Sequence, residues 1–512
     1  MIRSMLSLLI LLVAWRATHA EESLDIGSRR ELFVDDHVIA QLDGRAELRL
    51  HHPVPREMAL VHDAPWEGSG CGYHSVFRDG DRYRLYYKAW HLDVSGGRLD
   101  SSAHPLFCCY AESDDGIHWR KPELGLHEFR GSKANNIVMV SGKIGSIHAD
   151  AGHPAVFKDE NPNAPADARY KAILRSAGAR GLLAMKSADG IHWSPMCDAP
   201  IITDGAFDSQ NLAFWDSVRG EYRAYWRIFT KGVTTEKVWK PAGVRAIRTA
   251  TSANFLDWGP HEDLTYVDSP AEHLYTNQVK AYYRAPHIFI GFPTRYVDRG
   301  WSDSMRALPE RAHREARAAA GQRLGTALSE GLLMASHDGV HFKRWNEAFL
   351  RPGMEREGTW AYGDAYIAWH VVETKSSLEG APNELSLYAS ESYWTGKGSA
   401  LRRYTLRIDG FVSASAPLEG GELITKPVAF QGKNLEMNFS TSAAGSIRVE
   451  LQDAAGTPLP GFSLADGAEL FGDSLDRTVS WKGGTDVSDA AGKPVRLRFV
   501  LKDADLYSFR FR

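Results

Sequence analysis

One short motif recurs along the chain and constrains its fold more than any other feature. It reads Ser-x-Asp-Gly, a hydrophobic residue, His and an aromatic residue, and its three clear copies begin at Ser113, Ser187 and Ser336. A degenerate copy begins at Ser252. Asp-Gly supplies the positive φ angles of a tight turn, and the Ser and Asp side chains can hydrogen-bond the turn backbone. Each copy follows a strand-like run, so the motif predicts a β-hairpin with its aromatic residue packed between neighbouring sheets.

The spacing of these hairpins predicts the architecture. Successive motif serines are 74, 65 and 84 residues apart, which fits one four-stranded blade plus its loops. A second recurring unit, made of a strand, a polar turn and an alternating strand, precedes each hairpin. Its copies begin near Val76, Ala155, Leu212 and Val279, and a fifth runs from Trp360 to Trp369. The sequence therefore predicts an all-β fold with a five-bladed β-propeller.

Two segments depart from the blade pattern. Residues 309–328 are rich in Ala, Arg and Glu and predict a helix inserted in the fourth blade, near the rim of the cleft. After about residue 411 the strands alternate apolar and polar residues between Gly-rich turns, which predicts a β-sandwich over 412–512. The propeller, with an N-terminal strand segment, is expected over 21–411.

The first twenty residues have the pattern of a secretory signal peptide. Arg3 precedes an apolar run over 6–15, and the small residues Thr18 and Ala20 form an acceptable cleavage site. This run is too short to span a bilayer, and no later stretch could do so. We expect a secreted or periplasmic protein with no membrane span after cleavage; an uncleaved membrane anchor is the alternative.

Composition limits the partners. A formal net charge of -4 gives no electrostatic footprint for nucleic acid. Fifteen Trp, nineteen Tyr and twenty-one Phe suit a β-rich core, and also a cleft in which sugar rings stack on aromatic faces. The four cysteines lack the spacing of a zinc site or a disulfide framework, although an oxidising compartment would permit Cys71 to pair with Cys108 or Cys109; the fourth is Cys197.

The hairpins, the run from Ser75 to Tyr83 and a sandwich after a propeller resemble the five-bladed propeller glycoside hydrolases. This superfamily includes β-fructosidases of family 32 and arabinanases of family 43. The resemblance covers about residues 50–512 and is architectural, because the Trp-Met-Asn-Asp-Pro, Arg-Asp-Pro and Glu-Cys signatures of family 32 are absent from the sequence. It implies a glycoside hydrolase acting on a polysaccharide or oligosaccharide, and it leaves the sugar and the stereochemistry open.

Cleavage of a glycosidic bond needs two carboxyl groups, an acid and a nucleophile or base. The resemblance implies that such acids lie on the inner strands of successive blades. Asp150 and Asp208 each lie six residues before an equivalent apolar strand residue, and Glu272 lies seven before one. We expect these three side chains to meet in one funnel, with Glu272 as the acid and Asp150 or Asp208 as the base or nucleophile.

Further residues near the same strand ends are candidates for binding substrate. They are Glu67, His74, His153, Gln210, Asn277, Arg295, Glu357 and Trp360. No zinc-type His pair or Asp-rich calcium loop is present in the sequence, so no cofactor is expected beyond a structural calcium ion. A non-catalytic glycan-binding protein and a partner-binding propeller of the cell envelope are the alternatives. Two funnel carboxylates within glycosidase range, one of them protonated, would favour the enzyme.

Overall fold

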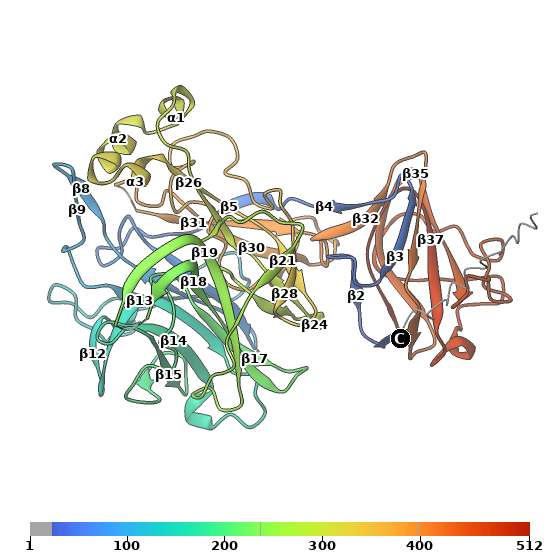
Figure 1. Ribbon diagram of the computed structural model, residues 1–512, viewed down its shortest axis with the longest axis horizontal. Coiled ribbons are helices and arrows are strands. Elements are labelled where there is room, and N and C mark those ends of the chain that lie inside the picture. Colours follow the sequence, from blue (N-terminus) through green and yellow to red (C-terminus); the bar gives the residue numbers. More distant parts are fainter. Residues whose placement is uncertain (1–22, 236, 397) are drawn as a thin grey trace, which may run out of the picture.

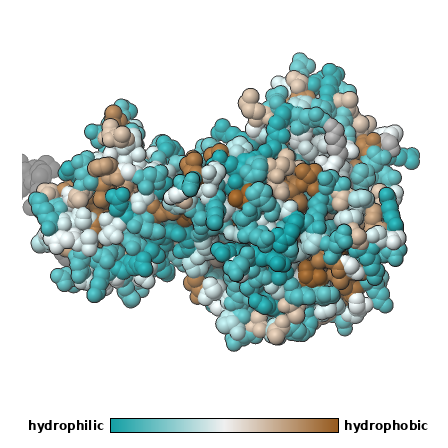
Figure 2. Space-filling model, turned by 180° about the vertical axis from the view of Figure 1, so that it is seen from behind, coloured by the Kyte–Doolittle hydropathy of each residue, from teal (hydrophilic) through white to brown (hydrophobic). Residues whose placement is uncertain are grey.

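The computed structural model describes residues 23–235, 237–396 and 398–512, and it is nearly all β. The chain forms a larger part built of several sheets and a smaller part built around one ten-stranded sheet (Figure 1). The predicted signal peptide, residues 1–20, lies outside the described residues. Seen from behind, the surface is mostly hydrophilic with small hydrophobic patches (Figure 2).

Five sheets of four or five strands follow one another in the larger part, and most neighbouring strands pair antiparallel. The first contains β6 (Gly72–Asp79), β7 (Arg82–Ala89), β10 (Phe107–Ser113) and β11 (Ile137–Val140). The second contains β12 (Gly142–Ile144), β13 (Ile147–Lys158), β14 (Tyr170–Ser176), β15 (Leu182–Ser187) and β16 (Ser194–Pro195), with η1 (Ala166–Ala168) in one connection. The third contains β17 (Leu212–Asp216), β18 (Glu221–Thr234), β19 (Trp239–Ser252) and β20 (Glu262–Asp263).

The last two sheets bring together distant parts of the chain. The fourth contains β21 (Thr265–Val267), β23 (Lys280–Tyr282), β24 (Ala285–Gly291), β27 (Met334–Ser336) and β28 (His341–Arg344). The fifth contains β29 (Val372–Thr374), β30 (Glu384–Glu391), β31 (Ala400–Leu406) and β5 (Val54–Val61). Because β5 precedes the first sheet in the chain but pairs with β31, the two ends of the larger part are joined in one sheet.

The recurring motif links neighbouring sheets. Gly116, Gly190 and Gly339 have φ angles of 74°, 82° and 82°, as the tight turn requires. The carbonyl of Gly190 in the second sheet accepts a hydrogen bond from the Tyr86 hydroxyl of the first sheet at 2.9 Å. Equivalent bonds join the third sheet to the fourth and the fifth to the first: Tyr225 to Gly339 and Tyr388 to Gly116. The motif aromatics Trp119, Trp193 and Phe342 meet the same tyrosines edge-on, as the sequence predicts.

The N-terminal strands belong to the smaller part, which corrects the expected boundary. They are β1 (Leu24–Gly27), β2 (Glu31–Leu32), β3 (Ile39–Gly44) and β4 (Glu47–Leu50), and they pair with β34, β37, β33 and β32. Ile26, Phe33 and Val38 are buried in the same core as Phe499 and Phe509. This apolar contact, and not proximity in the sequence, decides where the segment packs.

The rest of the ten-stranded sheet comes from the C-terminal residues. Its strands are β32 (Val412–Ala416), β33 (Gly421–Thr425), β34 (Val428–Phe430), β35 (Leu435–Asp453), β36 (Asp473–Thr478) and β37 (Val495–Phe511), with η2 (Ser488–Ala490) before the last. The long strands β35 and β37 pair along their whole length, with register shifts at two places. Their inward side chains form one hydrophobic cluster.

An insertion in the fourth sheet stands over the larger part (Figure 1). It contains β22 (His273–Leu274), β25 (Thr294–Asp298), α1 (Asp303–Ala307), α2 (Arg311–Ala320), α3 (Gln322–Thr326) and β26 (Ala327–Gly331). Helix α2 contacts the hairpin of β8 (Asp93–Ser95) and β9 (Arg98–Asp100). The helix expected over 309–328 is therefore a set of short helices, which turn at Gly321.

Three further observations bear on function. All four cysteines are free, so Cys71 does not pair with Cys108 or Cys109. No helix in the described residues is long and apolar enough to cross a membrane. Within the same part of the chain, no group of three or more His, Cys, Asp or Glu side chains is placed to hold a metal ion.

Candidate functional site

The first strands of the sheets, and the residues just before them, meet around a common axis. Gln210 donates from Nε2 to the carbonyls of Tyr73 in the first sheet and Pro154 in the second. Gln278, before β23 of the fourth sheet, donates to Oε1 of Gln210 at 2.9 Å and to the carbonyl of Ile367, which precedes the fifth, at 2.8 Å. These inner segments of all five sheets are therefore held together at their middle by two amides.

A cluster of tyrosines lies on the N-terminal side of this amide pair. The Tyr275 ring is 5.6 Å from that of Tyr366 and 6.2 Å from those of Tyr296 and Tyr362. The hydroxyls of Tyr362 and Tyr275 are 3.2 Å apart. These four residues come from the fourth sheet with its insertion and from the approach to the fifth, so the cluster exists only when the sheets are assembled.

Two arginines from the third sheet lie over the same rings. The guanidinium of Arg227 is 4.8 Å from the Tyr275 ring centre, and that of Arg245 is 5.1 Å from Tyr275 and 5.0 Å from Tyr296. Burial raises the pKa of Tyr275, but Arg227, the Tyr362 hydroxyl and Arg245 outweigh it, so the net pKa lies below that of an ordinary tyrosine. We call Arg227, Arg245, Tyr275, Tyr296, Tyr362 and Tyr366 the funnel cluster.

Parts of the funnel cluster have unused hydrogen-bonding capacity. The Tyr366 hydroxyl and the Nε atom of Arg245 are buried and have no hydrogen-bond partner among the described residues. Buried polar atoms in folded proteins are nearly always bonded to protein or water. Both atoms are enclosed by protein, and the pocket that Tyr366 lines with Lys88 and Tyr362 holds only about 10 Å³.

Lys88 lies beside the cluster in an aromatic box. Its ammonium is 4.5 Å from the ring centres of Tyr73 and Trp90 and 5.5 Å from that of Tyr393. No carboxylate lies within 4 Å of it in the described part of the chain. Burial lowers the pKa of Lys88 to about 8, because desolvation disfavours the charged amine. An amine of this kind can give up its proton near neutral pH.

Asp150 and His153, two of the residues expected from the sequence, form a pair next to Tyr73. His153 Nδ1 is 2.9 Å from Asp150 Oδ2, and the His153 and Tyr73 rings are 5.4 Å apart. Burial raises the pKa of Asp150, but His153, the Arg175 guanidinium and the Gly152 amide bring it down to about 2. Asp150 is thus an ionised carboxylate that orients an imidazole.

Asp208 lies at the edge of the cluster and is half exposed, and it forms an ion pair with the buried Arg227. It also lines an open cleft of about 440 Å³ between the second and third sheets. Arg175, which pairs with Asp150, lines this cleft, as do Arg180 and Trp239, whose side chains stack with 4.5 Å between guanidinium and ring. The cleft therefore combines cationic groups with an exposed aromatic face.

Glu272 and Arg295 form a separate ion-pair group. Glu272 is 3.3 Å from Arg295 and 3.0 Å from Arg344 of β28, and Arg295 is also 2.6 Å from Glu330. The carboxylate of Glu272 is thus bound to two arginines of β25 and β28, and none of its described ion pairs involves the funnel cluster.

Four of the residues expected to bind substrate are buried in the scaffold. Glu67 is wholly buried and accepts from Lys121 Nζ at 2.6 Å and from the Ala64 amide at 2.9 Å. His74 is 3.2 Å from the ring nitrogen of His62. Gln210 belongs to the central amide pair. The last of the four is Asn277, which is 1 % exposed.

Glu357 and Trp360 lie at the rim near the helical insertion. Glu357 is exposed, and the indole of Trp360 donates to the Gly353 carbonyl at 2.9 Å. The Trp360 carbonyl accepts from Arg314 of α2 at 2.9 Å, and Arg317 of the same helix stacks on Trp394. Helix α2 thus forms a wall beside the mouth.

The funnel cluster is absent from the sequence-based candidates, apart from its neighbours His153, Asp150 and Asp208. Its members are arginines and tyrosines, so a prediction based on paired carboxylates does not include them. One signal is present in the sequence: Tyr275 and Tyr366 each lie four residues before a residue of an inner segment, Val279 and His370.

No protein-family model matches the sequence, and no curated protein is similar enough to count as a match. An endo-arabinase from Bacteroides thetaiotaomicron is 12% identical with a TM-score of 0.38, over 70% of this chain and 98% of that chain. An N-acetylgalactosamine deacetylase from F. plautii is 14% identical with a TM-score of 0.39, over 70% and 94%. The catalytic domain of a family 62 α-L-arabinofuranosidase from Coprinopsis cinerea is 10% identical with a TM-score of 0.37, over 70% and 97%.

Proposed function

We propose that this chain is a secreted or periplasmic carbohydrate-active enzyme that cleaves a glycosidic bond in an acidic glycan at the funnel cluster. The observation that carries the proposal is the position of Tyr275 under two arginine guanidinium groups, next to the Tyr366 hydroxyl, which has no hydrogen-bond partner among the described residues. A phenol with a lowered pKa beside unused donors is typical of a reactive site.

We propose that the five sheets are the blades of a five-bladed propeller and that the ten-stranded sheet folds as a β-sandwich. The pairing of β5 with β31 and the tyrosine bonds between neighbouring sheets support the ring. The hydrophobic cluster that the paired strands β35 and β37 share with the N-terminal strands and with Trp481 and Val487 supports the sandwich. Secretion rests on the signal-peptide pattern of residues 1–20.

The charge of the substrate follows from the groups around the mouth. Arg227 and Arg245 lie over the Tyr275 ring, Lys88 lies over the neighbouring Tyr73 ring, and Arg175 and Arg180 line the adjoining cleft. Asp150 and Asp208 are each already bound to an arginine, and burial raises the pKa of Asp364, between Tyr362 and Tyr366, to about 8, so that it adds little negative charge. An excess of cationic groups in a concave site attracts anions. The exposed ring of Trp239 offers a face for a sugar ring.

The reaction uses two groups whose pKa values are shifted toward neutral pH. The Tyr275 phenolate attacks the anomeric carbon, the bond from that carbon to the leaving oxygen breaks, and the leaving oxygen takes the Lys88 ammonium proton. Water then attacks the anomeric carbon and gives a proton to the neutral Lys88 amine, and the bond from that carbon to Tyr275 Oη breaks, which restores the phenolate and the ammonium. Tyrosine nucleophiles occur among glycosidases outside the usual carboxylate pair.

In this scheme the acids have positioning roles. Asp150 orients His153, and Asp208 holds Arg227 against Tyr275. Glu272 holds Arg295 and Arg344. The carboxylate mechanism expected from the sequence stays a competing proposal, and the amide variants Asp150→Asn, Asp208→Asn and Glu272→Gln decide between them. If kcat falls by about 10²-fold or more in the amide variants while Tyr275→Phe keeps the kcat of the parent, the carboxylate mechanism is favoured.

A second reaction is favoured by the arginines. If the substrate carries a carboxylate next to the reacting carbon, Arg227 and Arg245 neutralise it, and Tyr275 can remove the adjacent proton to eliminate the leaving oxygen. Elimination leaves an unsaturated uronate, which absorbs in the ultraviolet, whereas hydrolysis does not.

The experiment is a screen of the mature protein against acidic and neutral polysaccharides, with reducing ends and ultraviolet absorbance followed together. We expect new reducing ends with an acidic polysaccharide. Binding without turnover on every polysaccharide would instead favour a non-catalytic glycan-binding protein.

A further inference from the structure

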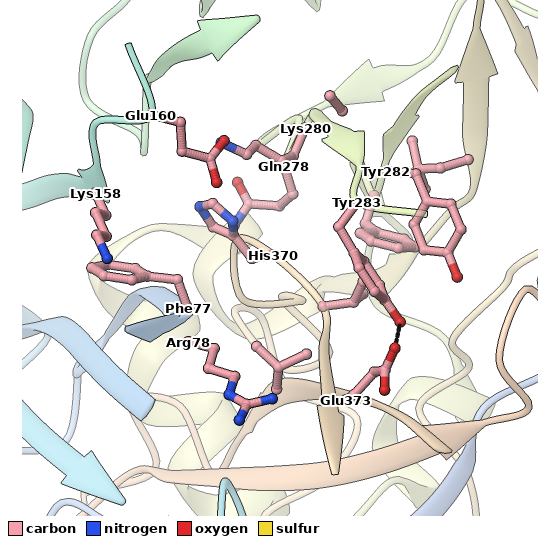
Figure 3. A pocket seen from close by; sticks show the side chains of 15 residues that line it. Phe77, Arg78, Lys158, Glu160, Gln278, Lys280, Tyr282, Tyr283, His370 and Glu373 are labelled. Carbon is pink, nitrogen blue, oxygen red and sulfur yellow. Dashed lines mark hydrogen bonds between the residues drawn. The ribbon is translucent and has the colours of Figure 1, made fainter. Parts of the chain in front are cut away.

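A second cavity, of about 330 Å³, lies away from the funnel cluster (Figure 3). Its lining includes Phe77 of β6, Lys158 of β13, Lys280 of β23 and His370 before β29. These come from the inner segments of the first, second, fourth and fifth sheets. Its volume falls at the lower end of the range for small-molecule sites.

The cavity occupies the opposite mouth of the axis. In the four inner segments, the lining residues follow residues of the funnel region by four or five positions: Phe77 after Tyr73, Lys158 after His153, Lys280 after Tyr275 and His370 after Tyr366. At about 3.3 Å per residue, this offset corresponds to roughly 13–17 Å. The amide pair of Gln210 and Gln278 lies between the two mouths.

One amide oxygen of the pair is aimed into this cavity. Gln210 Nε2 faces the carbonyls of Tyr73 and Pro154, so its oxygen must face Gln278. Gln278 therefore presents Nε2 to Gln210 and to the Ile367 carbonyl, which leaves its oxygen on the cavity side. That Oε1 atom is buried without a hydrogen-bond partner among the described residues, and Gln278 is 3 % exposed.

A ring nitrogen and an amine complete the polar wall. His370 Nε2 is also buried without a partner in the described part of the chain, and Figure 3 shows this ring beside Gln278. Burial and the nearby Lys280 keep the pKa of His370 well below its usual range, so the ring is neutral. Lys280 lies over the Phe214 ring at 4.7 Å. The Glu160 carboxylate lines the same cavity and acts on the charge of Lys280, but none of the described ion pairs joins the two groups.

The mouth of the cavity offers an aromatic face. Tyr283 is 48% exposed and is held in place by a hydrogen bond from its hydroxyl to Glu373. Figure 3 shows its ring on the side of the cavity across from Lys158. Exposed aromatic rings of this kind stack on the apolar faces of sugars.

We propose that this cavity is a second ligand site for a sugar acid of one or two rings, with the carboxylate on Lys280 and the hydroxyls on Gln278 Oε1 and His370 Nε2. A hydroxyl is the donor that Gln278 Oε1 lacks among the described residues, and a carboxylate is the group that would pair with the Lys280 ammonium. The ring lies against Tyr283. The site does not depend on catalysis at the funnel cluster, since it uses different residues on the other side of the amide pair.

The test measures acetylation of the Lys280 side chain itself, so ligand binding at the funnel cluster does not affect the result. The mature protein is acetylated with limiting acetic anhydride, with and without sodium galacturonate, and each lysine is quantified by mass spectrometry. We expect acetylation of Lys280 to fall about tenfold at a galacturonate concentration about ten times Kd. Lys482 of the smaller part, which is exposed, serves as the internal control and keeps its rate.

Three further ligands show what the carboxylate and the sugar ring each contribute to binding, and whether the natural ligand is a free sugar acid or the end of a chain. Galactose lacks the carboxylate and acetate lacks the ring, so both must protect Lys280 much less than galacturonate. Stronger protection by a galacturonate trimer than by the free sugar would identify a chain end as the ligand; equal protection would identify the free sugar. Calorimetry with Tyr283→Ala and Lys280→Met should show one fewer binding event, and Lys482→Met should match the parent.

Unchanged acetylation of Lys280 at saturating galacturonate would overturn the proposal. Equal protection by galactose would overturn the assignment of the carboxylate to Lys280. Activity on a glycan is measured in a separate assay, so a failure of ligand binding in this cavity does not decide whether the funnel cluster is catalytic, and the reverse also holds.

Discussion

The side-chain amide of Gln278 donates to the amide oxygen of Gln210 at 2.9 Å, and this bond joins the inner segments of the third and fourth sheets on the axis of the larger part. Through the carbonyls of Tyr73, Pro154 and Ile367, the same two residues reach the other three sheets. The pair both holds the ring of sheets together and separates the funnel cluster from the opposite cavity.

Replacing Gln210 should therefore destabilise the larger part. Gln210→Leu removes a donor shared by several buried carbonyls, and each unpaired buried group costs about 1–3 kcal/mol. We expect the free energy of unfolding in urea to fall by about 3 kcal/mol. The exposed Gln431, changed to Leu, is the control. A difference between the two variants within about 0.5 kcal/mol would show that the pair is not structural.

Acid should destabilise the protein through two buried histidines. Burial lowers the pKa of His62 to about 4, and that of His74, 3.2 Å away, lies well below its ordinary value. The unfolded chain binds a proton near pH 6.5, so stability is lost as the pH falls from there toward 4. The free energy of unfolding falls between pH 7 and pH 5, and we expect this fall to be about 2 kcal/mol smaller for His62→Gln than for the parent. Parallel pH curves for the two proteins would contradict this.

The pH profile of the reaction should report Lys88. Because Lys88 must be protonated to act as the acid, kcat/KM should fall as the pH rises through about 8. Lys88→Arg keeps the charge but cannot release a proton, so we expect kcat to fall by about 10²-fold or more without this alkaline limb. An unchanged limb in the arginine variant would assign the titration to another group.

Arg245 should bind the anionic part of the substrate. Arg245→Met keeps a similar apolar stem and removes the charge beside Tyr275 and Tyr296. We expect KM for an acidic glycan to rise about tenfold or more, which corresponds to about 1.4 kcal/mol. Arg448→Met, on the surface of the ten-stranded sheet, is the matched control. Equal KM values for the two variants would remove Arg245 from the binding site.

The parts of the fold that depend on local chemistry could be predicted from the sequence. The Asp-Gly turns and their serines sit in adjacent residues, so their spacing predicts the sheets. The N-terminal strands could not be placed in this way, because the partners of Ile26 and Phe33 lie more than 380 residues later in the chain.

The candidate site was only partly predictable. The sequence places the three acids only by their offset from an inner strand, and side chains on a strand alternate between faces. Asp208 and Glu272 lie before their strands begin, and a register shift separates Asp150 from Ala155, so this alternation does not decide where the three side chains point. Tyr275 and Arg227 come from different sheets, and their contact follows only from the assembled ring.

The most direct test of the account is the turnover of Tyr275→Phe on the acidic polysaccharide that the parent protein cleaves. This variant keeps the ring under Arg227 and Arg245 and removes only the hydroxyl. We predict that kcat falls by about 10³-fold while the unfolding midpoint stays close to that of the parent. Full turnover by Tyr275→Phe, or faster cleavage of neutral than of acidic polysaccharides by the parent, would contradict the account.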